Sequence, residues 1–215
     1  MDSQILDKSQ IKIYLLIGGG TDSAALINFY QSRRANINGI HFNYGQPSLA
    51  GERRSVNALA EYYQISISSI DLGMKISHAK GEYYCRNATL LMAAASTFSA
   101  KQGILSLGIH SGTPYYDCSP EFLQDIQHLF DGYFGGTVQI EAPFLDFTKQ
   151  DIYKYCHKNK VPVEITFSCE RQSDRPCGEC PSCINRRTFS CERQSDRPCG
   201  ECPSCINRRM LDAIR

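Results

Sequence analysis

The sequence predicts an α/β fold, in which helices flank a doubly wound, mainly parallel five-stranded sheet of Rossmann-like type. Three observations lead to this prediction. Short apolar runs alternate with helical patterns over residues 1–165, as in sheets built from strand–helix–strand units. A glycine-rich turn joins the first apolar run to the first helical pattern. Eight of the 11 cysteines follow in residues 166–215. We therefore expect an α/β domain over 1–165 and a cysteine-rich, metal-binding segment with a short helical tail over 166–215.

The strands are recognised by short apolar or β-favouring runs. Residues 13–17 are almost wholly apolar, which is typical of a strand buried on both faces. Residues 65–72 alternate isoleucine with serine, a pattern that favours an extended chain. With the similar runs that follow, the predicted strands span 13–17, 37–42, 65–72, 103–109 and 138–144.

The helices follow from apolar spacing and from capping residues. Apolar side chains recur at the spacing of one helix face between Val56 and Tyr63. Residues 86–100 are apolar around most of the circumference, so we expect that helix to be buried. Ser119 before a proline and Thr148 before a polar turn are predicted N-caps. The predicted helices span about 24–30, 56–63, 86–100, 120–134 and 148–158.

Polar loops follow the predicted strands and contain most of the unusual polar residues. In a doubly wound sheet, ligands bind beyond the carboxyl ends of the strands, where the strand order reverses. The loops expected to meet there span 18–23, 43–47, 71–86, 110–118 and 145–149.

Composition limits the class of protein. The chain has 215 residues, 42% hydrophobic and 21% charged, and a formal net charge of +1. A nearly neutral chain argues against a broad nucleic-acid-binding face. The first ten residues are polar and no apolar run approaches the ~20 residues of a membrane span. We expect a soluble, cytoplasmic protein.

The glycine loop is a candidate anion site. Gly18, Gly19 and Gly20 precede Thr21, Asp22 and Ser23 at the start of a predicted helix, where free backbone N–H groups and the helix dipole attract anions. Two phosphate loops are excluded, because no Lys follows the glycines and Ser23 stands where a dinucleotide fingerprint needs glycine. A capped glycine turn without a ligand remains the alternative.

The cysteine segment carries the spacing of a metal site. Four cysteines follow the pattern C-x7-C-x2-C-x2-C, and four thiolates suit a closed, structural zinc site. An iron–sulfur run would continue with C-x3-C-P, which is absent. Unmetallated thiols are the remaining alternative. The predicted ligands are Cys169, Cys177, Cys180 and Cys183, or the repeat copy Cys191, Cys199, Cys202 and Cys205.

This segment is duplicated. Residues 166–187 are repeated letter for letter over 188–209, and identity over this length points to a recent or artificial duplication. Either copy could hold the zinc. Elsewhere, Cys85, Cys118 and Cys156 are interpreted as packing residues, and the five histidines show no ligand spacing, so none is assigned a catalytic role.

Several motifs together carry a resemblance to a known family. The loop Gly19–Ser23 (GGTDS) resembles the SGGxDS loop of ATP pyrophosphatases, with Gly18 in place of serine. With HFNYGQ (41–46), CRN (85–87), GTPYYDCSPEF (112–122), APFLDFTKQDI (142–152), VPVEITFSC (161–169) and CGECPSC (177–183), the chain resembles the 7-cyano-7-deazaguanine synthase family of queuosine biosynthesis over nearly its whole length.

The resemblance implies an ATP-dependent carbon–nitrogen ligase of ATP pyrophosphatase fold. Such an enzyme converts 7-carboxy-7-deazaguanine and ammonia to 7-cyano-7-deazaguanine through an acyl adenylate and an amide, and releases AMP and pyrophosphate. The implied cofactors are ATP, Mg²⁺ and a structural Zn²⁺. The implied partners are small-molecule substrates, with a homodimer possible and neither a membrane nor direct nucleic-acid binding expected.

The resemblance also implies roles for individual residues. Asp22, Ser23, Arg86 and Lys149 are the candidate catalytic residues. Candidate ATP contacts are Leu16, Ile17, Gly18, Gly19, Gly20, Thr21, Asp22, Ser23, Ala24, Ala25, Leu26, His41, Phe42 and Asn43. Candidate substrate contacts are Asn87, Tyr115, Asp117 and Glu121, with Tyr116 as an alternative stacking residue.

Two other functions remain open from the sequence. A synthase-like relative would adenylate a deazaguanine acid but stop at the amide, or would attach the acid to a macromolecule. A zinc-dependent nucleic-acid-binding protein would use the arginines beside the cysteines, although acidic residues interleave with them. Plainer roles also remain: Asp22 as a helix cap, Arg86 as a surface ion-pair partner, and Asp117 and Glu121 as turn and helix-start residues.

Overall fold

The computed structural model describes residues 12–79, 82–97, 102–110, 113–171 and 175–189. The second cysteine copy, Cys191 to Cys205, therefore lies outside the described residues, and its predicted metal site with it. Among the described helices, none combines the length and the apolar character needed to cross a membrane.

One parallel sheet organises the described chain. Its strands are β1 (Ile13–Leu16), β2 (Ile37–Asn43), β3 (Ile67–Asp71), β6 (Gly103–Leu107) and β7 (Val138–Glu141), in the order β3-β2-β1-β6-β7. Every neighbouring pair is parallel. The chain starts at the central strand, moves to one side through β2 and β3, and then returns to the other side. The order therefore reverses between β1 and β6, so their loops flank the place where ligands bind in such sheets.

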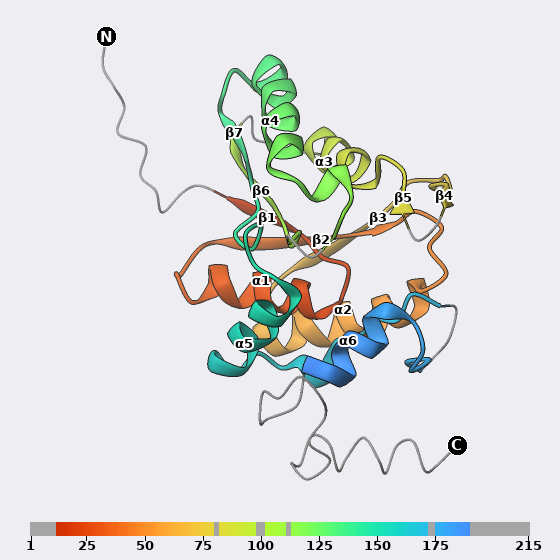
Figure 1. Cartoon of the computed structure of the whole chain (residues 1–215). Coiled ribbons are helices and arrows are strands. Elements are labelled where there is room, and N and C mark those ends of the chain that lie inside the picture. The colour runs from red at the N-terminus through yellow and green to blue at the C-terminus, as the bar shows by residue number, and fades with distance from the viewer. Residues whose placement is uncertain (1–11, 80–81, 98–101, 111–112, 172–174, 190–215) are drawn as a thin grey trace.

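Helices cover both faces of the sheet (Figure 1). One layer consists of α1 (Thr21–Gln31), α2 (Leu49–Tyr63) and α5 (Lys149–Lys158), and the other consists of α3 (Arg86–Ser96) and α4 (Pro120–Phe134). Each layer has its own core, because strand side chains alternate between the two faces. Leu15 and Ile17 lie in the first core and Leu16 and Ile40 in the second. The predicted doubly wound α/β fold is confirmed.

Two predicted caps take the expected form. The Ser119 hydroxyl accepts a hydrogen bond from the Phe122 amide at 3.1 Å. Thr148 and Asp151 form a capping box at the start of α5, in which each side chain accepts from the other's backbone amide. Both helices therefore begin where the sequence signals place them.

Some elements differ from the sequence prediction. The strands predicted over 65–72, 103–109 and 138–144 are shorter at their ends, because pairing stops before the apolar runs do. The helix predicted over 86–100 buries one face only, with Asn87, Leu90, Leu91, Ala94 and Ala95 inward. The predicted loop 71–86 contains a small antiparallel pair, β4 (His78–Ala79) and β5 (Glu82–Tyr83).

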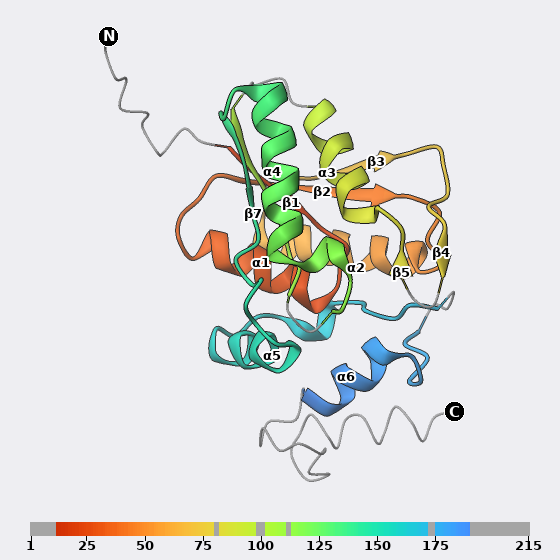
Figure 2. The same cartoon turned by 45° about the horizontal axis from the view of Figure 1, so that its top comes forward.

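The cysteine segment packs against the α2–α5 layer. A 3-10 turn, η3 (Val163–Ile165), leads into it, and α6 (Pro181–Phe189) lies against α5 (Figure 2). Arg186 of α6 donates to the carbonyls of Val163 and Thr166, at 2.6 and 2.5 Å. The helix α6 was not expected, and it begins at a proline, which fits a first helical turn. The division at residue 165 remains a prediction.

Candidate functional site

The glycine loop leaves β1 and enters α1 in a conformation that only glycine adopts without strain. Gly19 has φ +78°, and a Cβ there would lie 2.9 Å from the Glu52 carbonyl oxygen. Its own carbonyl accepts from the Ser55 hydroxyl at 2.6 Å and from the Phe167 amide at 2.9 Å. The loop is therefore held from two sides, by α2 and by the start of the cysteine segment. Gly18 differs, because a Cβ there would meet no atom within 4 Å.

The loop presents unpaired backbone amides at the start of α1. The Gly18 amide donates to the Ser23 hydroxyl at 3.0 Å, and the Thr21 amide donates to the Ser168 hydroxyl at 3.4 Å. Within the described part of the chain, the amides of Gly19, Gly20, Asp22 and Ser23 find no acceptor. First-turn amides have no partner inside a helix, and they converge on anions. The arrangement can hold a phosphate group.

Asp22 and Lys149 meet beside these amides. The Lys149 ammonium contacts both carboxylate oxygens of Asp22, at 2.7 and 2.6 Å, with side chains 19% and 27% exposed. Lys149 is the first residue of α5 and Asp22 lies in the first turn of α1. The structure brings these two predicted catalytic residues together, and places a carboxylate and an ammonium next to an anion site.

His110 belongs to the same region, although sequence reasoning assigned it no role. It follows β6, two residues after Gly108, where an added Cβ would lie 3.3 Å from the Asp22 carbonyl oxygen. Burial lowers the pKa of His110, Asp22 raises it, and Lys149 lowers it. Spacing in the sequence carried no such signal, since the proximity arises from the pairing of β6 with β1.

A second polar cluster joins the start of α3 to the turn before α4. Asn87 donates from its backbone to the Asp117 carboxylate at 3.2 Å and from its side chain to the Asp117 carbonyl at 2.9 Å. The Arg86 guanidinium donates to the Asn87 side chain at 3.2 Å. Burial would lower the pKa of Arg86, but Tyr44 and Asp117 raise it. Three predicted residues therefore form one connected group.

Tyr44 completes this second cluster. No role was predicted for it from the sequence. Burial raises its pKa to about 12, and its ring packs edge-on against Tyr83 at 5.5 Å. Both rings approach Arg86 from the loop after β2 and from β5. The cluster thus combines a cation, a carboxylate and flat aromatic surface.

The other predicted substrate residues are less closely connected to the group of Arg86, Asn87 and Asp117. Tyr115 is half-buried at the start of η2 (Tyr116–Cys118). Tyr116 is 57% exposed and its hydroxyl donates to Asp125 of α4, so its ring lies outside the second cluster. Glu121 is exposed in the first turn of α4. Their predicted contacts with substrate remain predictions.

The end of β2 is held by its own hydrogen bonds. Buried Gln46 donates to the Phe42 carbonyl at 2.9 Å and to the Glu52 carboxylate at 2.8 Å. Asn43 donates to Asp71 at 2.8 Å. His41 is 1% exposed, and its Nδ1 donates to the Ile17 carbonyl at 2.9 Å, while its Nε2 has no partner among the described residues. This network fixes the strand end beside the glycine loop.

Six of the predicted ATP contacts are buried hydrophobic core residues. Phe42 of β2 is 3% exposed. Leu16 and Ile17 are 9% and 3% exposed, and Ala24, Ala25 and Leu26 are fully buried. They support the loop from below, so any contact with a ligand would have to come from their backbone. Their place in an ATP site remains a prediction.

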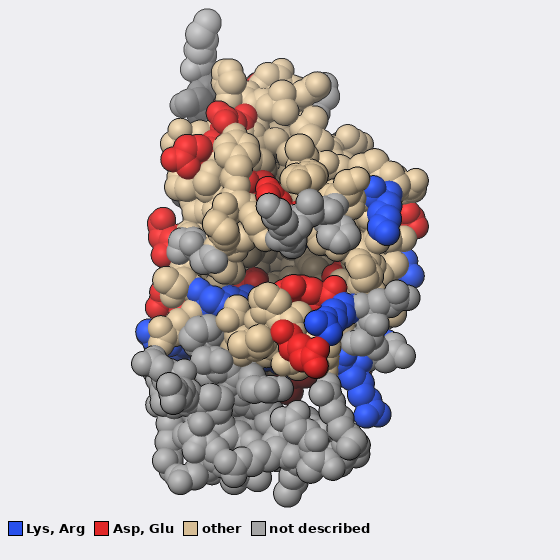
Figure 3. Space-filling model, turned by 45° about the vertical axis from the view of Figure 1, so that its right-hand side comes forward, with Lys and Arg blue, Asp and Glu red and all other residues tan. Residues whose placement is uncertain are grey.

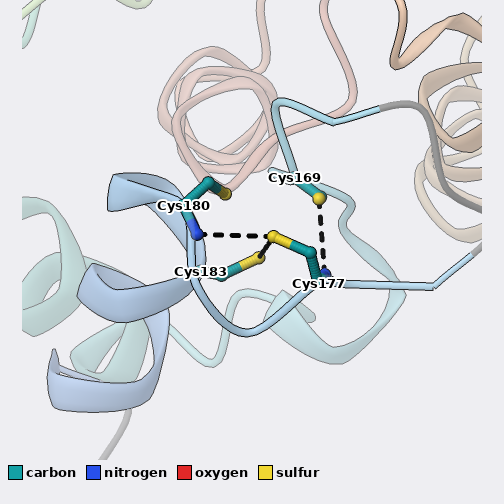
Figure 4. A group of neighbouring side chains, drawn as sticks. All are labelled: Cys169, Cys177, Cys180 and Cys183. Atoms are coloured by element: carbon teal, nitrogen blue, oxygen red, sulfur yellow. Dashed lines mark hydrogen bonds between the residues drawn. The ribbon is translucent and has the colours of Figure 1, made fainter.

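Four cysteines converge beneath the loop (Figure 4). The sulfurs of Cys169, Cys177, Cys180 and Cys183 all lie within 4.8 Å of one another. In a tetrahedron with Zn–S distances of about 2.3 Å, sulfurs are about 3.8 Å apart, and the Cys177 and Cys183 sulfurs are separated by 3.9 Å. The donor set therefore fits zinc without rearrangement of the fold.

Backbone amides support Cys177 as a thiolate. The amides of Glu179 and Cys180 donate to its sulfur at 3.5 and 3.3 Å. Although burial raises the pKa of Cys177, these bonds and those with the thiols of Cys169 and Cys180 lower it to about 6. Burial raises the pKa of Cys180 and that of Cys183. A metal ligand must be deprotonated, so the surroundings of Cys177 favour that one residue as a ligand.

The edge at which β2 and β3 end forms one face of the molecule. Figure 3 shows that face hollowed, with acidic and basic groups around the hollow. The glycine loop follows β1, the cluster of Tyr44 and Arg86 follows β2 and β5, and Lys149 follows β7. Most of the predicted polar site residues thus lie at the carboxyl ends of the strands, where a ligand is expected in such a sheet.

Comparisons with known proteins identify the family of the chain. The 7-cyano-7-deazaguanine synthase of Methanoculleus marisnigri is 31% identical over 206 residues, covering 82% of this chain and 92% of the relative. That of Aquifex aeolicus is 29% identical, covering 81% and 94%. A solved structure of a predicted tRNA methyltransferase subunit from Methanocaldococcus jannaschii matches 73% of this chain and 93% of that subunit, at 14% identity and a TM-score of 0.47. The model of the family described as queuosine biosynthesis protein QueC matches residues 12–82 and 77–188. The chain belongs to this family.

Proposed function

We propose that this protein is an ATP-dependent ligase that converts 7-carboxy-7-deazaguanine and ammonia to 7-cyano-7-deazaguanine. One observation carries the proposal: the unpaired amides of the glycine loop lie beside the Asp22–Lys149 pair, where the strand order reverses. The names of the relatives supply the reaction. A site for a leaving pyrophosphate is what an adenylating enzyme needs.

The glycine loop binds the leaving group in this proposal. The amides of Gly19, Gly20, Asp22 and Ser23 donate to pyrophosphate oxygens, whose charge grows as the α-phosphate is transferred. Lys149 neutralises part of that charge from α5, and the strand end His41–Asn43 faces the adenosine. Mg²⁺ held by Asp22 would supply further charge neutralisation when bound.

The cluster on the other side binds the base. Arg86 pairs with the substrate carboxylate, while Asp117 accepts from the N–H edge of the deazaguanine ring. Tyr115 provides a ring against which the base stacks, and Asn87 holds Asp117 in place through the two hydrogen bonds observed. Glu121 contributes a second acceptor from the start of α4.

The proposed reaction uses two adenylation steps, first of the carboxylate and then of the amide. A carboxylate oxygen attacks the α-phosphate of ATP, forms an acyl adenylate and expels pyrophosphate. Ammonia displaces AMP, loses a proton, and leaves the amide. The amide oxygen is then adenylated by a second ATP, and loss of AMP and protons from nitrogen gives the nitrile. Overall, two ATP give two AMP and two pyrophosphate.

The four-cysteine cluster has a structural part in this proposal. Zn²⁺ bound by four thiolates has no open position for substrate, so it stabilises the segment after residue 165 rather than the reaction. We propose that the chain divides as the sequence predicts, into the α/β domain over 1–165 and the zinc segment over 166–215. A homodimer and a cytoplasmic location are further parts of the proposal; the first rests on the resemblance, and the second on the composition of the sequence.

Gly18 favours a second candidate function, that of an enzyme which forms the amide but not the nitrile. The family loop carries a serine hydroxyl here, and this chain has none. Release of pyrophosphate from ATP, measured with and without 7-carboxy-7-deazaguanine and ammonia, tests the proposal. We expect release that depends on the acid. Release that is independent of the acid, or absent from folded protein, would contradict it. About one pyrophosphate for each molecule of base consumed would indicate the amide-forming relative.

A further inference from the structure

The hydroxyl of Ser168 lies against the glycine loop, although the two are far apart in sequence. Its oxygen accepts from the Thr21 amide at 3.4 Å, across a separation of 147 residues. The same oxygen lies 3.3 Å from the position a Cβ would occupy on Gly20. The hydroxyl therefore borders the row of unpaired amides.

This hydroxyl has a proton to donate. Because its oxygen accepts from Thr21, its O–H points elsewhere, and no acceptor for it is found in the described ranges of the chain. A half-buried hydroxyl can donate to water or to a ligand oxygen. An oxygen of a phosphate seated on the amides of Gly20 and Asp22 would provide the acceptor.

The neighbours of Ser168 fix it in this position. The Phe167 amide donates to the Gly19 carbonyl at 2.9 Å. The Phe167 ring covers Gly51 of α2, where a Cβ would lie 2.3 to 2.6 Å from ring carbons. On the other side, Cys169 belongs to the four-cysteine cluster, into which the Phe167 ring packs. The backbone at Ser168 is thus anchored at both ends.

We infer that Ser168 is a phosphate-contacting residue of the glycine loop, supplied from the cysteine segment. Its hydroxyl accepts from Thr21 and donates to the bound pyrophosphate, next to a loop in which Gly18 offers no hydroxyl. The four-cysteine cluster places the side chain, and the loop amides complete the site. The inference rests on the proposed function, because it takes the loop to bind pyrophosphate.

Calorimetry with Mg²⁺ and inorganic pyrophosphate tests the inference on the full chain. Ser168→Ala removes the hydroxyl and leaves the backbone anchors. Ser182→Ala is the matched control, because the Ser182 hydroxyl donates to Glu170 at 2.6 Å within the same segment. We expect Ser168→Ala to weaken pyrophosphate binding by about 10-fold, as for one hydrogen bond to a charged group, and Ser182→Ala to leave it unchanged.

Two further readouts separate a phosphate contact from loss of structure. Zinc content and adenosine affinity should be the same in Ser168→Ala as in the parent, since neither involves the hydroxyl. Unchanged pyrophosphate affinity in Ser168→Ala would overturn the inference, and so would a parallel loss of zinc or of adenosine binding.

The outcome also distinguishes this inference from the proposed function. If the parent binds pyrophosphate and Ser168→Ala binds it more weakly, but no nitrile forms, the inference stands and the reaction is wrong. If nitrile forms and Ser168→Ala binds pyrophosphate normally, the reaction stands and the inference is wrong. A parent that binds no pyrophosphate would contradict both.

Discussion

The ammonium of Lys149 contacts both carboxylate oxygens of Asp22, although 127 residues separate them. The pair joins the first turn of α5 to the first turn of α1. It lies at the loop that presents the unpaired amides. A cation fixed at this place can neutralise a leaving pyrophosphate without having to be ordered during the reaction.

Replacing Lys149 should therefore impair catalysis more than folding. Lys149→Met should lower kcat/KM for ATP by about 100-fold, the scale found for loss of one charge-stabilising group. The free energy of unfolding should fall by about 1 kcal/mol or less, as for a partly exposed ion pair. Steady-state kinetics and denaturant unfolding measure both. Lys154→Met is the control, because Lys154 pairs with exposed Asp151 at 3.5 Å and is itself exposed. Equal activity in the two variants would contradict the role of Lys149.

Gly19 should tolerate no side chain. Its φ of +78° is strained for alanine, and the new Cβ would lie 2.9 Å from the Glu52 carbonyl oxygen. Gly19→Ala should weaken pyrophosphate binding by at least about 10-fold, since one misplaced loop loses several amide donors. Gly132→Ala in α4 has open space and should be neutral or stabilising by up to about 1 kcal/mol. Titration calorimetry of both variants checks this, and normal binding by Gly19→Ala would show that the loop conformation does not matter.

Removal of metal from the cysteine cluster should affect the distant loop. Phe167, whose ring packs into the cluster, bonds to the Gly19 carbonyl. Chelation should release the segment, lower the melting temperature and weaken pyrophosphate binding by about 10-fold or more. Adding Zn²⁺ back should restore both. Melting curves and pyrophosphate titrations before and after chelation give the answer, and unchanged affinity in verified metal-free protein would contradict the coupling.

His110 should make the fold sensitive to mild acid. Burial, aided by Lys149 and opposed by Asp22, lowers its pKa in the folded state. The unfolded chain then binds a proton first, so stability falls as the pH drops below the ordinary value of about 6.5 and levels off below the folded pKa. His110→Gln should flatten this part of the profile. Denaturant unfolding at several pH values between 7 and 5 measures the slope, and identical slopes in both proteins would show that His110 is not responsible.

Gly18 should accept a serine without strain. A Cβ there would meet no atom within 4 Å, and the residue does not adopt a positive φ. Gly18→Ser would add the hydroxyl that the family loop carries, so pyrophosphate release should rise by up to about 10-fold. Kinetics of the variant against the parent test this. Unchanged or lower release would contradict this expectation.

Local signals in the sequence predicted most of the fold. Ser119 and Thr148 cap helices that begin at the next residue, and the apolar run of β1 forms its own strand. These signals concern only neighbouring residues in the sequence. The four cysteines also lie close enough in sequence to imply a cluster. What the sequence could not predict depends on packing between distant elements. The contact of Ser168 with Thr21 depends on the packing of Phe167 against Gly51 of α2.

The candidate site could likewise be predicted only in part. The sequence predicted that the loops holding Asp22, Lys149, Arg86 and Asp117 meet at one edge of the sheet. It did not predict which of these residues contact one another. Pairing depends on strand order, which puts β6 and β7 on one side of β1 and β2 on the other. His110 was passed over for this reason, since an isolated histidine has no spacing to interpret.

The most direct test of the account is the mass of the base after reaction. Purified protein is incubated with ATP, Mg²⁺, nitrogen-labelled ammonia and 7-carboxy-7-deazaguanine. The products are then separated and identified by mass spectrometry. The account predicts a labelled nitrile, together with AMP and pyrophosphate, and loss of all three in Lys149→Met. An unchanged acid in the presence of folded, zinc-loaded protein would contradict it.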